Sequence, residues 1–88
     1  MRTELTVAAI ESSIEECTKK LFWRLKQKGR GCFASNHEIF GVIVQETSEY
    51  ETDIHERVPD DEKIQELYDI AVAALIGAAS IKSHGTDW

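Results

Sequence analysis

Two pairs of acidic residues recur at the same short spacing in the middle of the chain. Glu46 and Glu49 are three residues apart within "QETSEY", and Glu66 and Asp69 are three residues apart within "QELYDI". On a helix, residues three apart lie on one face with Cβ atoms about 5 to 6 Å apart. Four carboxylates gathered from two helices would repel one another, and a divalent cation would relieve that repulsion. The spacing predicts a metal site formed by Glu46, Glu49, Glu66 and Asp69.

Mg²⁺ is the ion that such a site would suit, because it takes oxygen ligands and keeps water and substrate phosphates in its shell. The acids have apolar neighbours in sequence, which acids on a fully hydrated face would not need: Ile43, Tyr50, Ile70 and Val72. The alternative is a solvated acidic face, since acids three residues apart are common on charged helices. Three further acids extend this face and are expected to be hydrated: Asp53, Glu56 and Glu62.

Three helical segments must position these acids. Apolar residues at helical spacing predict a first helix over residues 1–29, a second over 35–57 and a third over 60–82, followed by a tail at 83–88. Ser35 with Glu38 is typical of a capping box at a helix start. Pro59 disfavours helix at the preceding residue and separates the second helix from the third.

The predicted fold class is all-α, a single domain over residues 1–88 whose second and third helices form an antiparallel hairpin. Glu49 lies ten residues before Pro59 and Asp69 ten after it, so counting outwards from the proline sets them level across the hairpin. A chain of 88 residues has a thin core. We therefore expect oligomerisation, with a dimer that forms a four-helix or larger bundle.

Composition narrows the function classes. The formal net charge of −6 argues against binding to a nucleic-acid polymer, which needs a basic surface. Two cysteines, Cys17 and Cys32, form no disulfide framework and match no zinc spacing, and Cys17 is expected in the core. No apolar run reaches the length of a membrane span and no signal peptide is visible, so we expect a cytoplasmic protein without a membrane partner.

The segments "NHEIFGVIVQETSEY" and "QELYDIAVAAL" together resemble the MazG-like branch of the all-α nucleoside triphosphate pyrophosphohydrolases. That family is marked by ExxE followed by ExxD, here Glu46 with Glu49 and Glu66 with Asp69. The resemblance implies an enzyme that uses Mg²⁺ to cleave a nucleoside triphosphate into the monophosphate and pyrophosphate. It also implies a homodimer or homotetramer, because members of that family are helical bundles of two or four chains. Family members often carry a further Glu before each motif Glu, where this chain has Gln45 and Gln65.

Within that resemblance, Glu49 is the acid we expect to activate the attacking water. Two other readings stay open: a nucleotide or metal binder of the same fold with weak or lost turnover, and a structural helical oligomer that regulates a partner. Phe22 and Trp23 could stack on a base or pack in an interface. A basic cluster could clamp phosphate or form a solvated face, and it comprises Lys19, Lys20, Arg24, Lys26, Lys28 and Arg30.

Overall fold

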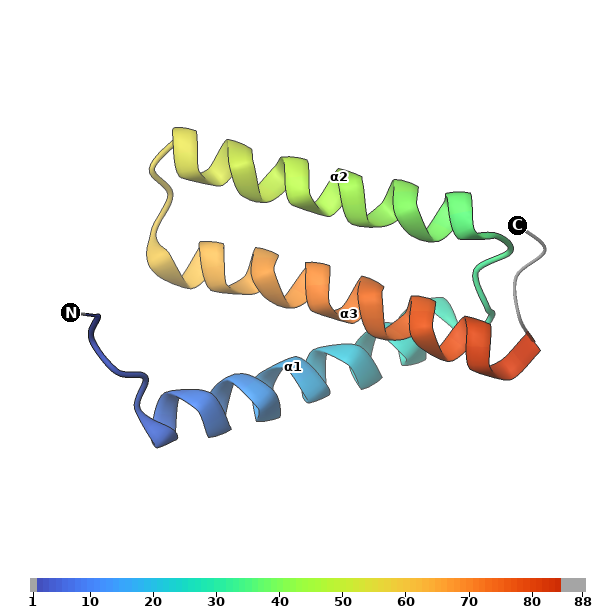
Figure 1. Cartoon of the computed structure of the whole chain (residues 1–88), viewed down its shortest axis with the longest axis horizontal. Coiled ribbons are helices and arrows are strands. Elements are labelled where there is room, and N and C mark those ends of the chain that lie inside the picture. The colour runs from blue at the N-terminus through green and yellow to red at the C-terminus, as the bar shows by residue number, and fades with distance from the viewer. Residues whose placement is uncertain (1, 85–88) are drawn as a thin grey trace. The chain divides into compact units, whose positions relative to one another are not determined.

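The computed structural model describes residues 2–84 and contains three α-helices and no strand in that range. They are α1 (Val7–Lys28), α2 (Asn36–His55) and α3 (Asp60–His84), as shown in Figure 1. The all-α prediction is confirmed for these residues. The end of the predicted tail, including Trp88, lies outside the described residues.

The chain divides into two compact units, Met1–Arg30 and Gly31–Trp88, and each is described by itself. In the first unit, Thr6 caps α1 by accepting a hydrogen bond from the Ala9 N–H at 3.0 Å. The helix therefore begins later than the sequence pattern alone suggests. It ends at Gly29, whose φ of 86° is readily adopted only without a Cβ, and whose N–H donates to the Leu25 carbonyl at 2.8 Å.

α1 contains no buried residue. Cys17 is half-buried rather than part of a closed core, and Cys32, in the segment after α1, is exposed; both are free thiols. Apolar side chains of this unit that face solvent include Leu5, Ile14, Phe22 and Trp23. α1 therefore presents much of its apolar surface to water.

In the second unit, α2 begins at the predicted capping box. The Glu38 N–H donates to Ser35 Oγ at 3.1 Å, and the Glu38 carboxylate accepts from the Ala34 N–H at 2.7 Å. The carboxylate thus satisfies the donor one residue before the cap itself. The Glu38 N–H lies in the first turn of α2 and has no intrahelical acceptor, whereas the Ala34 N–H lies just before the helix. The two side chains of the capping box satisfy both donors.

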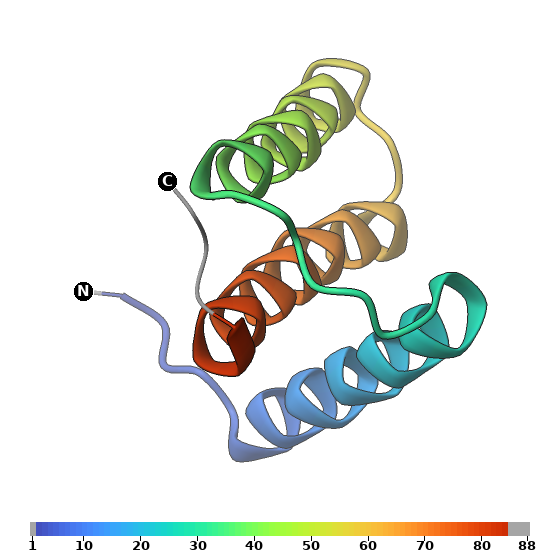
Figure 2. The same cartoon turned by 90° about the vertical axis from the view of Figure 1, so that its right-hand side faces the viewer.

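The chain turns back through residues 56–59, and Figures 1 and 2 show α2 and α3 side by side. Arg57 adopts a left-handed φ of 55° just after α2 ends at His55. The Pro59 carbonyl accepts from the N–H groups of Glu62 at 3.1 Å and Lys63 at 3.3 Å. The Pro59 carbonyl thus accepts the first hydrogen bonds of α3, and Asp60 and Asp61 lie in the first turn of that helix.

Small residues on α3 let α2 approach closely. Gly77 is buried, and a Cβ added to it would lie only 2.8 Å from Cγ2 of Ile39 on α2. Ser80 is also buried, accepts from the Phe33 N–H at 2.9 Å and donates to the Ile76 carbonyl at 2.8 Å. These contacts tie the start of α2 to the C-terminal half of α3.

α3 is also long and apolar enough, by length and composition alone, to meet a criterion for membrane-crossing helices. Core helices of soluble proteins meet the same criterion. α3 carries the ionisable Glu66 and Asp69 among its apolar residues, and such groups are costly in hydrocarbon.

Replacing Gly77 by alanine tests the close approach. We expect G77A to lower the free energy of unfolding by about 1 to 2 kcal/mol, because the overlap with Ile39 outweighs the gain in helix propensity. The matched control is Gly41→Ala on α2, where an added Cβ meets nothing within 4 Å; it should raise stability by about 0.5 to 1 kcal/mol. Urea denaturation measures both changes, and equal effects would contradict the packing.

Candidate metal site

The packing of α2 on α3 gathers three of the four predicted acids. Carboxylate oxygens of Glu46 on α2 and of Glu66 and Asp69 on α3 lie within 4.8 Å of one another. All three residues are half-buried. These three residues, here called the carboxylate cluster, come from both helices, so the cluster exists only when the helices pack.

Glu49 is not part of the carboxylate cluster and is exposed on α2. It is nevertheless a neighbour of the cluster, because protonated Glu46 donates a hydrogen bond to the Glu49 carboxylate. The structure therefore places Glu49 beside the cluster with access to solvent. The roles of Glu49 as a fourth metal ligand and as the water-activating acid both stay predictions.

Burial and the neighbouring carboxylates lower the acidity of Glu46. Burial raises its pKa from 4.5 to about 7, with further contributions from Glu49, Asp69 and Glu66. Burial disfavours the charged form, and each neighbouring carboxylate adds repulsion. The ionised cluster thus holds negative charge that a cation would neutralise.

The cluster is partly shielded from water. Burial raises the pKa of Glu46, and the Oε2 atom of Glu66 is shielded from solvent. The sequence neighbours Ile43, Tyr50 and Ile70 are half-buried. Removal of water lowers the effective dielectric and strengthens interactions between charges. A cation at this position would interact more strongly with the carboxylates than it would on an open surface.

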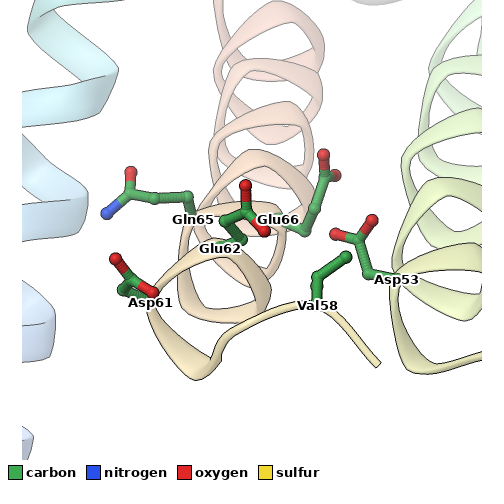
Figure 3. Close-up of a pocket in the computed structure, with 6 residues that line it drawn as sticks. All are labelled: Asp53, Val58, Asp61, Glu62, Gln65 and Glu66. Atoms are coloured by element: carbon green, nitrogen blue, oxygen red, sulfur yellow. The ribbon is translucent and has the colours of Figure 1, made fainter. Parts of the chain in front are cut away.

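A hollow of about 430 Å³ lies at the turn end of α2 and α3. Figure 3 shows Asp53 reaching from α2 toward α3, with Glu66 extending from α3 on the same side and Val58 below them. Because Glu66 belongs to both, the hollow adjoins the carboxylate cluster. No local sequence signal indicates it, since it is formed where the turn meets both helices. Its lining residues are Asp53, Val58, Asp61, Glu62, Gln65 and Glu66.

The basic cluster belongs to the first unit. Lys19 forms an ion pair with Glu15 at 3.1 Å across one turn of α1, with both side chains mostly exposed, which is the behaviour of a solvated helix face. Lys26 and Arg30 line a separate hollow of about 320 Å³ together with Phe22 and Leu25. A role for these cations in binding phosphate stays a prediction.

No match was found when the chain was compared with protein-family models, with curated proteins and with solved structures. The functional argument accordingly depends on the residues and on their geometry.

The raised pKa of Glu46 predicts a pH dependence of stability without metal. Between pH 4.5 and about 7 the folded chain retains a proton that unfolded Glu46 has released. The free energy of unfolding should therefore fall as pH rises through this window, and Glu46→Gln should flatten that fall. Urea midpoints in the presence of a chelator measure this. The control Glu51→Gln, an exposed acid on α2, should keep the wild-type dependence; identical curves for all three proteins would refute the assignment.

Proposed function

We propose that the protein is a Mg²⁺-dependent nucleoside triphosphate pyrophosphohydrolase, which converts a ribo- or deoxyribonucleoside triphosphate to the monophosphate and pyrophosphate. The observation that carries the proposal is the carboxylate cluster, in which Glu46, Glu66 and Asp69 bring oxygens within 4.8 Å of one another. These residues come from the ExxE and ExxD motifs that resemble the MazG-like family. The proposal joins this motif resemblance to the geometry.

The donor set fits Mg²⁺. Carboxylate oxygens are the ligands this ion prefers. Oxygens of Glu46, Glu66 and Asp69 lie within 4.8 Å of one another, so a single cation could contact all three residues. Three carboxylates leave room for water and for phosphate oxygens, which Mg²⁺ retains when it binds nucleotides.

When bound, Mg²⁺ would neutralise the triphosphate and favour attack by water at phosphorus. In this proposal Glu46, Glu66 and Asp69 hold the cation, and Glu49 accepts the proton of the attacking water. A new bond forms from the water oxygen to the α-phosphorus, while the bond from that phosphorus to the bridging oxygen of the leaving pyrophosphate breaks. The exposure of Glu49 and its place beside Glu46 support this role.

The proposal also covers the binding partners of the enzyme and its location in the cell. Its partners are a nucleoside triphosphate and further copies of the same chain, as a homodimer or homotetramer in which the α2–α3 hairpin completes a helical bundle. The net charge of −6 supports the absence of a nucleic-acid polymer as partner. A cytoplasmic location, without a membrane partner, would place the enzyme with the nucleotide pool.

A second candidate is a nucleotide-binding or metal-binding helical oligomer of the same fold with weak or no turnover, acting as a regulator. Gln45 and Gln65 favour it, because they replace acids that often precede the motif glutamates in the family. Fewer carboxylates near the cluster would hold fewer metal ions. This candidate predicts nucleotide binding with little pyrophosphate release.

Release of pyrophosphate from a panel of nucleoside triphosphates distinguishes the candidates. With Mg²⁺ we expect turnover of at least one ribo- or deoxyribonucleotide, and Glu49→Gln should lower kcat about 100-fold or more. Glu51→Gln, also on α2 and exposed, is the matched control and should retain activity. Nucleotide binding without pyrophosphate from any member of the panel would favour the second candidate.

Stabilisation by Mg²⁺ separates both candidates from a purely structural role. A ligand that binds only the folded chain raises its melting temperature. We expect Mg²⁺ to raise the melting temperature of the wild type and of E51Q, and to have little effect on Asp69→Asn, because Asp69 is in the carboxylate cluster. A melting temperature of the wild type that does not respond to Mg²⁺ would contradict a metal site.

A further inference from the structure

The hollow of about 430 Å³ at the turn end of α2 and α3 is here called the turn-end hollow. All of its lining residues fall between Asp53 and Glu66, so they belong to the second unit and none comes from α1. Pockets that bind small molecules in proteins measure about 300 to 1,000 Å³. The turn-end hollow is therefore large enough to hold a nucleobase.

The turn after α2 fixes two of the lining residues relative to each other. The Val58 N–H donates to the Asp53 carbonyl at 3.2 Å, and both residues are half-buried although residues 54–57 between them are exposed. In Figure 3 the Asp53 carboxylate reaches from α2 toward α3, and Val58 lies below it. The turn-end hollow thus offers a carboxylate beside an apolar side chain, which suits a planar ring with a polar edge.

The turn-end hollow also lies where the base of the substrate would have to lie. Glu66 lines the hollow and belongs to the carboxylate cluster, so the two adjoin. In the proposed reaction water attacks the α-phosphorus, and only the ribose separates that phosphorus from the base. A nucleotide whose phosphates are held at the carboxylate cluster would therefore have its base close to the cluster, as the turn-end hollow is.

The lining determines which base would fit. Ionised carboxylates accept hydrogen bonds and donate none, so they favour a ligand edge made of N–H donors and repel phosphate. Guanine has two adjacent donors, N1–H and N2–H, on its Watson–Crick edge, and these match the two oxygens of one carboxylate. Adenine and cytosine each present an amino group beside an acceptor, and uracil presents one N–H between two carbonyls. The acids of the lining are Asp53, Asp61, Glu62 and Glu66.

We propose that the turn-end hollow binds the base of a guanine nucleotide, with Asp53 accepting hydrogen bonds from N1–H and N2–H and Val58 in contact with the face of the ring. Asp53 is then the residue that determines base specificity. The proposal rests on the proposed function, since it takes the carboxylate cluster as the place of the phosphates.

Inosine nucleotides test the pairing, because inosine is guanosine without the N2 amino group. Calorimetry in the presence of Mg²⁺ gives the Kd of guanosine and inosine 5′-monophosphates, and steady-state kinetics gives kcat/KM for the two triphosphates. The inosine nucleotide should bind about tenfold more weakly, because a hydrogen bond to a carboxylate is lost. Equal Kd values for the two monophosphates would overturn the guanine site.

Asp53→Asn tests the residue. It replaces an acceptor oxygen by an NH₂ donor, so the preference for guanosine over inosine should disappear. Affinity for xanthosine 5′-monophosphate, which has a carbonyl oxygen where guanosine has the amino group, should rise in D53N. The matched control Glu51→Gln, exposed on α2 and outside the turn-end hollow, should keep the wild-type preference.

A merely structural role of Asp53 would weaken all nucleotides alike in D53N and leave the ratio of guanosine to inosine affinity unchanged. That result, with wild-type helicity by circular dichroism, would overturn the assignment of Asp53.

Pyrophosphate release separates the failure of this proposal from the failure of the proposed function. Preferential binding of guanosine 5′-monophosphate without pyrophosphate from any triphosphate would support the guanine site and contradict the hydrolase. Pyrophosphate released from all triphosphates with equal kcat/KM would overturn the guanine site and leave the hydrolase standing. Absence of both nucleotide binding and pyrophosphate release would overturn both.

Discussion

The second unit depends on the close approach of α2 and α3 where Ile39 packs against Gly77. That contact sets the register of the two helices. Glu46 lies seven residues after Ile39, and Asp69 lies eight residues before Gly77, so both are about 10 to 12 Å from the contact along their helices. This apolar packing contact thus determines which carboxylates meet. The free energy gained by packing α2 on α3 must offset the repulsion among those carboxylates.

Much of this unit could be predicted from local sequence signals. The Ser35 capping box and the break at Pro59 act through neighbouring residues, so the pattern reveals them. Local signals could not predict which acid of α2 lies opposite which acid of α3. Counting from Pro59 paired Glu49 with Asp69, but α2 ends at His55, so the turn is centred before the proline and Glu46 meets Asp69 instead. The hollow lined by Asp53, Glu62 and Glu66 also cannot be predicted from local sequence, because it forms where the turn meets α2 and α3.

One face of α3 both packs on α2 and carries the acids. Gly77 packs against Ile39 of α2, and Glu66, eleven residues earlier and so about 20° around the helix, belongs to the carboxylate cluster together with Asp69. Its richness in small residues was visible in the sequence, but which faces are covered depends on three-dimensional packing. One helix thus supplies both the packing contact with α2 and two of the three residues of the carboxylate cluster, in a chain of 88 residues with a thin core.

The central claim is that the carboxylate cluster binds a divalent cation, and proton release on binding tests it most directly. The pKa of Glu46 lies at about 7, so binding of Mg²⁺ near that pH must displace a proton. Calorimetric titration of Mg²⁺ in two buffers of different ionisation enthalpy measures the protons released. The account predicts release of about half a proton near pH 7, and much less for Glu46→Gln. Absence of Mg²⁺ binding to the wild type, or binding with equal proton release in both proteins, would contradict it.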